Sequence, residues 1–415
     1  MKYERGLEGC RVLDLADERG AYCGRMLADF GADVVKIEPV TGDLSRNTSP
    51  LYENKAGADN SFYFYSLNMN KRGITLNLED VKGRELFKKL VKSADIVIES
   101  FKPGYLAGLG LDYANLKKIK PGLVMTSITP YGQDGPYKDY ESSDLVADAM
   151  SGWMYMIGDP DRAPLRVGVP QIYLHAGGQA VMATLIAYEF QQTTGKGQYV
   201  DVAIHGVITS ATFNALGFWE LRNQILPRSG PYRQGMSQTT KQQELWKCKD
   251  GFVAFILIGG SMGSRQNKRL VEWMVELNEA PDLLREMDWD TFDQANADPA
   301  FIASLDEAIS SVFMKHTMEE IFDAAKKFKI MLTPINTPGQ IMDCPQLAAR
   351  ETWQKVTHPD WGEFMVAKAP PHVSSGSLGF IRHAPRLGEH NHDIYAKELK
   401  IGTAEMVSLK EAKVI

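Results

Sequence analysis

Residues 9–38 are GCRVLDLADERGAYCGRMLADFGADVVKIE, and this stretch decides the fold class. It opens with a short apolar run, Arg11–Leu15, and closes with a second one, Asp33–Ile37. Between them, Tyr22–Phe30 carries apolar residues at helical spacing and is closed by Gly31. Strand, helix and strand in this order form the unit from which parallel sheets are built. The stretch therefore predicts an α/β fold.

The same alternation continues as far as residue 220. Further elements are expected as helices at Lys82–Val91, Gln179–Phe190 and His205–Glu220, and as strands at Asp95–Ile98, Gly122–Ile128 and Tyr199–Ile204. Short strands alternating with helices indicate a parallel sheet with helices on both faces. Ligands of such sheets bind at the carboxyl ends of the strands, which points to the loops after Leu15, Ile37, Ile98 and Ile128.

The chain is long for one hydrophobic core, and its composition changes near residue 225. With 415 residues, two domains are expected. Residues 224–243 are polar and rich in Gly, Ser and Gln, as in a linker. A strand at Phe252–Ile258 and helical sequence from Gln266 to Phe328 follow. We expect the first part of a large domain at 1–224, a smaller domain at 225–330, and a C-terminal segment at 331–415 that returns to the large domain.

Charge and composition exclude several classes of protein. The net charge of −6 argues against a nucleic-acid partner. The four cysteines, Cys10, Cys23, Cys248 and Cys344, are widely scattered and show neither metal-ligand spacing nor a disulfide framework. The N-terminus lacks the apolar core of a signal peptide, and no apolar run is long enough to span a bilayer. We expect a cytoplasmic protein with no membrane partner.

Two short segments in the first half are candidates for ligand binding. Lys71 and Arg72 stand before the strand Ile74–Leu76, where adjacent cations can hold a phosphate or form a solvated surface pair. Ser100 and Phe101 follow a predicted strand at its carboxyl end, where ligands gather. The Phe101 ring either stacks on an adenine or packs in the core.

Three other candidates are weaker. The glycines of the loop at 259–263 let backbone approach a ligand closely, although an ordinary strand-to-helix turn has the same composition. His390 and His392 stand close together, but no further ligand cluster accompanies them, so no metal is predicted. Ser142 and Ser143 lack the elbow motif of a hydrolase nucleophile.

Taken together, the motifs resemble those of the class III (carnitine-related) CoA-transferases. Besides residues 9–38, they are NKRGITLNL, ADIVIESFKPGYLAGLGLDY, SITPYGQDGPY, SSDLVADAMSGWMYMIGDPDRAPLRVGVP, TGKGQYVDVAI and PRLGEHNHDI. Each motif is weak by itself. Their occurrence in family order over almost the whole chain carries the resemblance.

The resemblance implies a fold and an assembly. Such proteins have a Rossmann-like large domain with a parallel sheet, built from both chain ends, and a smaller α/β domain in the middle. Two chains interlock as a dimer, and coenzyme A bound at the large domain reaches toward the small domain of the partner chain. A glycine loop of the small domain, matched here by Gly259, Gly260 and Gly263, shields reactive intermediates from water.

The resemblance also implies a covalent mechanism. An aspartate attacks the acyl-CoA thioester and forms an enzyme–acyl anhydride. The CoA thiolate then converts the aspartate into a thioester, and the acceptor carboxylate displaces CoA through a second anhydride. One difficult exchange is thereby split into easier steps. The substrates are an acyl-CoA and a small carboxylic acid, and no metal takes part.

Several residues match the CoA-contacting positions of the family. Lys71 and Arg72 match a Lys-Arg pair, and Ser100 and Phe101 match an Asn-Phe pair, with Ser an imperfect substitute. Arg19 is a further expected CoA-binding residue. Two departures weaken the expected CoA site. They are Gly108, where some members have an arginine, and the shortened first loop Ala16–Gly20, which carries the carboxylates Asp17 and Glu18.

The largest departure lies at position 173. The nucleophilic aspartate of the family usually stands three residues after the proline of GVP and four before a glycine. Pro170 and Gly177 therefore place Tyr173 at the nucleophile position, and the helix Gln179–Phe190 fixes this register without a gap. Tyrosine has a pKa near 10 and no carbonyl carbon, so it can accept an acyl group but cannot carry CoA as a thioester.

We therefore expect a subunit without its own nucleophile, paired in a heteromer with a homologous chain that keeps the aspartate. Heteromeric members of this kind act on aromatic succinates with succinyl-CoA as donor. Three alternatives stay open. They are a self-sufficient acyl-CoA enzyme with a non-aspartyl mechanism, a non-catalytic CoA-binding or regulatory protein, and a normal transferase whose carboxylate enters from elsewhere. A racemase is disfavoured because Ser143-Asp144 lacks the histidine that such relatives carry.

Overall fold

The computed structural model describes residues 5–233, 242–294, 296–369 and 371–415, which group into two compact units. The first unit comprises Met1–Trp153, Val167–Phe213 and Pro345–Ile415, as far as these are described. The second comprises Met154–Arg166 and Asn214–Cys344, again as far as described. The domain boundaries expected at 224 and 330 stay predictions. Within the described residues, no helix has both the length and the apolar character needed to cross a membrane.

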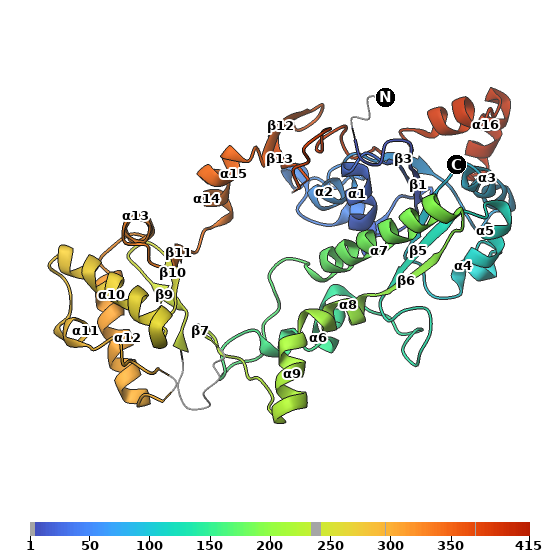
Figure 1. Cartoon of the computed structure of the whole chain (residues 1–415). Helices are drawn as coiled ribbons and strands as arrows, with labels where there is room; N and C mark the ends of the chain where they lie inside the picture. Colours follow the sequence, from blue (N-terminus) through green and yellow to red (C-terminus); the bar gives the residue numbers. More distant parts are fainter. Residues whose placement is uncertain (1–4, 234–241, 295, 370) are drawn as a thin grey trace. The chain divides into compact units, whose positions relative to one another are not determined.

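The first unit is built around a six-stranded parallel sheet with the strand order β3-β2-β1-β4-β5-β6 (Figure 1). Its strands are β1 (Arg11–Asp14), β2 (Asp33–Glu38), β3 (Arg72–Thr75), β4 (Ile96–Glu99), β5 (Val124–Thr129) and β6 (Tyr199–Ala203). In register, Leu13 lies opposite Val35 on one side and Val97 on the other. The predicted α/β fold class with a parallel sheet is confirmed.

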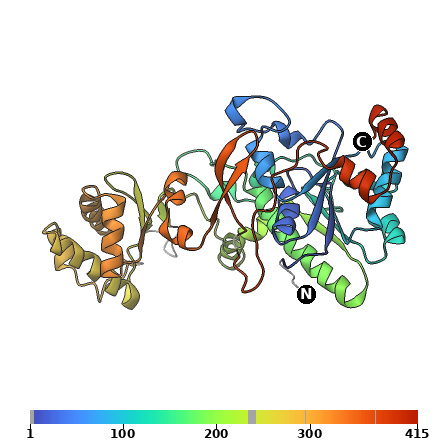
Figure 2. The same ribbon diagram turned by 90° about the horizontal axis from the view of Figure 1, so that it is seen from above.

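Helices cover both faces of this sheet because alternate strand residues point to opposite faces (Figure 2). The helices of the first unit are α1 (Ala21–Asp29), α2 (Phe62–Asn68), α3 (Val81–Val91), α4 (Tyr105–Gly108), α5 (Tyr113–Ile119), α6 (Asp144–Met150), α7 (Ile172–Thr194), α8 (Ile204–Ala211), α15 (Pro345–Ala349) and α16 (Thr403–Glu411). Leu13 belongs to the core cluster with α3, α5 and α16. Its neighbour Val12 belongs to the cluster with α1, α7 and α8.

Helix α7 begins earlier than the sequence indicates. We expected a helix from residue 179, since glycines 177 and 178 lower helix propensity. The structure begins it at Ile172 because α7 packs closely against α1. A Cβ atom at Gly177 would lie 2.8 Å from Tyr22 Cβ. The single helix expected at 205–220 is also wrong, since α8 ends at Ala211 and α9 (Phe213–Arg222) follows after Thr212.

Short helical turns and a C-terminal hairpin complete the first unit. The turns are η1 (Leu44–Asn47), η2 (Tyr52–Asn54) and the π-helical η4 (His392–Glu398), and the hairpin joins β12 (Trp353–His358) to β13 (Gly362–Ala367). The C-terminal segment packs beside β3. Asn391 Oδ1 accepts from the Thr75 N–H at 2.9 Å, and the Tyr395 hydroxyl donates to the Thr75 carbonyl at 2.7 Å.

The second unit has a three-stranded antiparallel sheet in the order β11-β10-β9 and a helical cluster. Its elements are η3 (Met154–Met156), β7 (Tyr232–Arg233), β8 (Gln242–Gln243), β9 (Leu245–Lys247), β10 (Phe252–Phe255), α10 (Gly260–Glu276), α11 (Asp282–Glu286), α12 (Pro299–Phe313), α13 (Met318–Phe328), β11 (Leu332–Pro334) and α14 (Pro338–Met342). Residues 234–241 of the predicted linker lie outside the described residues. The linker residues on either side of this segment form the β7–β8 pair.

The glycine segment expected as a loop at 259–263 is largely helical. Gly259 caps α10, and residues 260–263 form the first turn of that helix. Backbone crowding explains two of the glycines. A Cβ at Gly263 would lie 1.8 Å from the Ile258 carbonyl oxygen, and one at Gly259 would lie 2.8 Å from that of Phe292. Gly260 has φ of +75°, a left-handed conformation that glycine takes without strain. The shielding role of these glycines stays a prediction.

Candidate active site

A large cavity of the first unit lies at the carboxyl ends of β1 to β4, as the parallel sheet predicts. Its volume is about 630 Å³. Glu18 follows β1, residues 39–45 follow β2, Glu79 follows β3, and Phe101 follows β4 in lining it. Lys413 lines it from the C-terminal tail. The cavity is therefore large enough for a substantial organic ligand.

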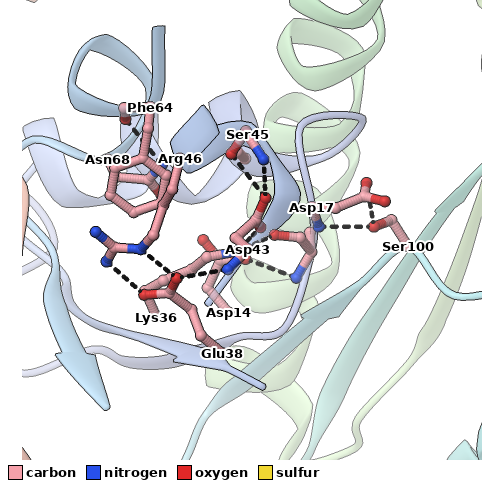
Figure 3. A network of polar contacts seen from close by, with 12 residues as sticks. Asp14, Asp17, Lys36, Glu38, Asp43, Ser45, Arg46, Phe64, Asn68 and Ser100 are labelled. Atoms are coloured by element: carbon pink, nitrogen blue, oxygen red, sulfur yellow. Dashed lines mark hydrogen bonds and ion pairs between the residues drawn. The ribbon is translucent and has the colours of Figure 1, made fainter. Parts of the chain in front are cut away.

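Buried ion pairs form one wall of this cavity (Figure 3). Lys36 Nζ lies 2.9 Å from Asp43 Oδ2 and also donates to a backbone carbonyl. Asp43 Oδ1 accepts from both the N–H and the hydroxyl of Ser45. Arg46 binds Glu38 through two parallel bonds, Nε to Oε2 at 2.6 Å and Nη2 to Oε1 at 2.7 Å. Each charge in this network faces an opposite charge.

The electrostatics of the network favour the ionised forms of Asp43 and Lys36. Burial opposes the charge of Asp43, but the Lys36 ammonium and the Ser45 hydrogen bonds outweigh it and lower the pKa of the carboxyl to about 2. Burial likewise opposes the charge of Lys36, yet Asp43, Asp14 and Glu38 raise the pKa of that ammonium above its usual range. The guanidinium of Arg46 lies 3.8 Å from the centroid of the Phe64 ring. Removing either partner of a pair would leave a buried charge uncompensated, which is strongly destabilising.

The two cations predicted to contact CoA point to different places. Lys71 is fully buried, with Nζ 2.7 Å from Asp14 Oδ2, 2.8 Å from the Ala21 carbonyl and 2.9 Å from Asn68 Oδ1. An ammonium has three N–H donors, and all three are used inside the protein. Burial lowers the pKa of Lys71 despite the Asp14 charge.

Arg72 lies at the amino end of β3, at the edge of the sheet opposite the cavity. Its Nε and Nη2 bind Asp33 at 2.8 and 2.5 Å, and Nη1 binds Glu398 at 2.6 Å. In this conformation neither Lys71 nor Arg72 offers a free donor to the cavity. Their role as CoA contacts stays a prediction, carried by the motif alone.

The loop after β1 meets the loop after β4, which brings together three predicted residues. Arg19 binds the Asp17 carboxylate through Nε at 2.9 Å and Nη2 at 2.5 Å. The Ser100 hydroxyl donates to Asp17 Oδ1 at 2.8 Å. Phe101 lines the cavity, with its ring centroid 4.7 Å from that of Tyr105. The sequence predicts that the Asp17 carboxylate weakens the CoA site. In the structure the Arg19 guanidinium balances the charge of this carboxylate.

Tyr173 is the second residue of α7 and is buried, with 5% of its surface exposed. Burial raises the pKa of its phenol above the usual range, and the charges of Glu18, Asp144 and Asp17 add to this effect while Arg19 opposes it. The Asp144 carboxylate accepts from the Ile172 N–H at 3.2 Å, at the start of α7. Burial thus favours the neutral phenol at Tyr173, and its match to the family's nucleophile position stays a prediction from the motif register.

Glu18 connects this region with the cavity that it lines. Burial, then the charges of Asp17 and Asp43, raise the pKa of Glu18. Burial, and then the charge of Glu18, raise the pKa of the Tyr63 hydroxyl. Both groups therefore hold their protons more tightly than they would in water.

Of the histidines considered for a metal, His390 Nδ1 accepts from the Gly73 N–H at 3.1 Å, while His392 is exposed. Among the described residues, no group of three His, Cys, Asp or Glu side chains could hold a metal ion. Sequence reasoning missed Tyr63, which belongs to an unremarked aromatic run, and Glu79 and Lys413. Lys413 carries no local signal, because only the fold of the tail brings it to the cavity.

Residues 7–391 of the chain match the family described as CoA-transferase family III. The chain belongs to this family. The resemblance inferred from the motifs is thereby confirmed, and acyl-CoA is the substrate class that CoA-transferases share. The family members discussed next extend over nearly the full length of the chain.

Two relatives in the family are named for succinyl or succinate chemistry. Succinyl-CoA:(R)-benzylsuccinate CoA-transferase subunit BbsE from Thauera aromatica is 34% identical over 393 residues, 92% of each chain. Succinate–glutarate CoA-transferase from Agrobacterium fabrum is 31% identical over 396 residues, 94% of this chain and 95% of the relative. A crystal structure of a CAIB/BAIF family protein from Brucella suis has 28% identity and a TM-score of 0.81, and the match covers 95% of this chain and 99% of that one. The fold and the family therefore agree.

Proposed function

We propose that this chain is the subunit without a nucleophile in a heteromeric class III CoA-transferase of the cytoplasm. The complete enzyme exchanges CoA between succinyl-CoA and a carboxylic acid, for which we propose an aromatic succinate. A homologous chain with an aspartate at the position of Tyr173 supplies the nucleophile. The two chains interlock, and this one contributes scaffold and part of the binding surface.

Tyr173 carries this proposal. The family mechanism needs a side-chain carbonyl that becomes first an anhydride and then a CoA thioester. A phenol has no such carbonyl, and the burial of Tyr173 holds the group in its neutral, weakly nucleophilic form. The relative at 34% identity bears the word subunit in its name, which favours a role within a larger assembly.

An apolar stripe on α7 gives independent support for a partner chain. Met182, Ile186 and Phe190 follow one another at helical spacing and are 52%, 66% and 40% exposed. The opposite side of the helix, with Ala180 and Ala187, is buried against the sheet. A helix that is apolar on both sides is typical of an element packed between two layers. We therefore assign the stripe to the subunit interface.

The first test is the native mass and subunit composition of the complex isolated from source cells. We expect equal amounts of this chain and of a related chain with aspartate at the equivalent position. A homodimer of this chain with full exchange activity would contradict the proposal. Met182→Glu with Ile186→Glu should abolish assembly, whereas Val81→Glu, at an exposed apolar position on α3, should leave it intact.

One observation favours a second candidate function. Glu18 lines the cavity and acts electrostatically on Tyr173, so a carboxylate is present beside the position of the missing aspartate. In that case the Glu18 carboxylate attacks the thioester carbonyl, expels the CoA thiolate and becomes the anhydride. Glu18→Gln in the isolated chain separates the two candidates. Loss of a measurable exchange activity would favour this second function, and absence of activity in both forms would favour the first.

A further inference from the structure

Two histidines lie where the C-terminal segment of the first unit, Pro345–Ile415, meets the rest of that unit. His358 stands at the turn of the β12–β13 hairpin, and His390 lies beside the edge strand β3. Both imidazoles accept hydrogen bonds from backbone N–H groups at Nδ1. Since a backbone N–H can only donate, these bonds require a ring without a proton on Nδ1.

His358 shapes the hairpin turn. Its Nδ1 lies 3.2 Å from the backbone nitrogen of Asp360 and 3.2 Å from that of Trp361. The Trp361 ring packs on the first part of the chain, with its centroid 5.0 Å from that of Tyr65 and 5.6 Å from that of Tyr52. An imidazolium carries a proton on Nδ1 and repels both N–H groups. Protonation of His358 therefore opposes the turn that places Trp361 there.

His390 covers the edge of the six-stranded sheet, where β3 has no further strand beside it. Its Nδ1 accepts from the Gly73 N–H at 3.1 Å, and its backbone N–H donates to the Gly73 carbonyl at 2.9 Å. The next residue, Asn391, accepts from the Thr75 N–H at 2.9 Å. Protonation of His390 turns the first of these bonds into a repulsion between two N–H groups.

A third histidine, His383, links the hairpin to α2. Its Nε2 lies 3.0 Å from the Thr357 carbonyl oxygen, and its Nδ1 lies 2.7 Å from the Tyr65 hydroxyl. Because a carbonyl only accepts, Nε2 carries the proton of the neutral ring, and Nδ1 accepts from Tyr65. The ring centroids of His383 and His358 are 4.9 Å apart. A positive charge on one ring therefore disfavours a positive charge on the other.

The surroundings of both Nδ1 acceptors favour the neutral ring. Burial is the largest cause that lowers the pKa of His358 and of His390 below the ordinary value of 6.5, and neighbouring cations add to it while carboxylates oppose it. The groups that face His358 are His383, Arg386, Asp360, Asp59 and Tyr65, and those that face His390 are Arg382, Arg72, Glu389 and Asp393. Since the unfolded chain binds these protons more tightly, the stabilisation is present above the unfolded pKa. It is lost as pH falls through the lowered values.

We propose that His358 and His390 form an acid-sensitive switch, whose protonation releases the β12–β13 turn from α2 and uncovers the edge of β3. The switch also reaches the large cavity, because Arg46 Nη2 in the cavity wall donates to the Pro385 carbonyl at 3.0 Å. Acid therefore loosens one support of that wall and leaves the interior strands β4 and β5 paired. The proposal is independent of the role as a subunit without a nucleophile.

The test is hydrogen exchange followed by mass spectrometry, on the full chain in its natural assembly. It is run at about pH 5 and about pH 8, on either side of the ordinary histidine pKa, with rates expressed relative to the unfolded chain at the same pH. We expect protection of β3 and of the β12–β13 turn to fall roughly tenfold at the lower pH, equivalent to one pKa unit. Protection of β4 and β5 should stay unchanged. Equal protection of β3 and the turn at both pH values, or an equal fall in every strand, would overturn the proposal.

A double variant locates the switch. In His358→Asn combined with His390→Asn, the amide oxygen accepts backbone N–H groups but does not titrate, so protection should no longer depend on pH. The control is His392→Asn, at a side chain that is 73% exposed, and it should behave as the wild type. A fall of wild-type size in the double variant would contradict the proposal. The wild-type pH series decides by itself if the double variant does not fold.

Discussion

Two neighbouring polar regions of the first unit are built in opposite ways. Beside the large cavity, Lys36 faces Asp43 and Arg46 faces Glu38, so buried charges cancel in pairs. Around Tyr173, the carboxylates of Glu18, Asp144 and Asp17 all act on the phenol, and Arg19, the cation that opposes them, is bound to Asp17. In the first region a substitution of either partner would leave a buried charge unpaired, so the residues there cannot be replaced singly without loss of stability. The second is arranged around a neutral side chain.

The largest effect is expected from breaking the buried pair Lys71–Asp14, whose charges act on Lys36 of the first region. Lys71→Met leaves the fully buried Asp14 carboxylate without its cation and should cost about 3–5 kcal/mol of unfolding free energy. Urea unfolding followed by circular dichroism measures it. Adding Asp14→Asn should restore part of the lost unfolding free energy. The control Lys89→Met, at an exposed position of α3, should leave the unfolding free energy almost unchanged. An unchanged midpoint for Lys71→Met would mean that the pair has no structural role, and would return Lys71 to the CoA site.

Glu99 differs from the paired charges beside the large cavity. It is buried but has no ion pair among the described residues. Its pKa rises from 4.5 to about 7 in the folded protein, so the folded state holds this proton more tightly than the unfolded state. The wild type should therefore lose roughly 3 kcal/mol of stability as pH rises from 4.5 to 7, relative to Glu99→Gln. Denaturation of both proteins at pH 4 and pH 8 measures this. A stability difference that stays the same at both pH values would show that Glu99 titrates normally.

The carboxylates around position 173 should hinder any restored nucleophile. Tyr173→Asp introduces a carboxyl next to Glu18, and like charges disfavour its ionised form. Adding Glu18→Gln should lower the pH midpoint of any CoA exchange that appears by about one unit, equivalent to ~1.4 kcal/mol. The pH profile of exchange between labelled CoA and succinyl-CoA gives the midpoint. Identical profiles for the single and double variants would mean that Glu18 does not influence position 173.

The smallest effect is expected from the phenol itself. No hydrogen bond of the Tyr173 hydroxyl is found within the described residues, so Tyr173→Phe should change stability by less than about 0.5 kcal/mol. Thermal unfolding provides the measurement. Tyr395→Phe is the matched control, because its buried hydroxyl donates to the Thr75 carbonyl and its loss should cost about 1–2 kcal/mol. A larger loss in Tyr173→Phe than in the control would indicate a structural bond at position 173.

Local sequence patterns were sufficient for the fold class but not for side-chain direction. The strand from Arg11 and the strand from Asp33 are found where the apolar runs predicted them. Lys71 and Arg72, in contrast, looked like one phosphate-binding pair. Successive residues entering a strand point to opposite sides, so Lys71 reaches Asp14 while Arg72 reaches Asp33. Adjacency in the sequence cannot reveal this.

At the candidate site, too, some features follow from the local sequence and others need the folded chain. The register from Pro170 matches Tyr173 to the family's nucleophile position, and the structure places Tyr173 in the first turn of α7, ahead of the helix start expected at residue 179. The pairing of Asp17 with Arg19 needs the turn after β1, and the approach of Lys413 needs the whole tail to fold back. The glycines at 259 to 263 predict a loop that approaches a ligand or an ordinary strand-to-helix turn, and the structure agrees with the turn, since close packing of Gly263 against the Ile258 carbonyl requires glycine at the start of the helix.

The position of β3 at the sheet edge has a consequence for biosynthesis. Its backbone N–H groups at Gly73 and Thr75 bond to His390 and Asn391, which are made more than 300 residues later. Until the ribosome has released that segment, β3 presents open strand-pairing groups, which are the usual starting points of aggregation. The nascent chain must therefore wait with an uncovered sheet edge while the second unit, whose residues end at Cys344, has already been synthesised.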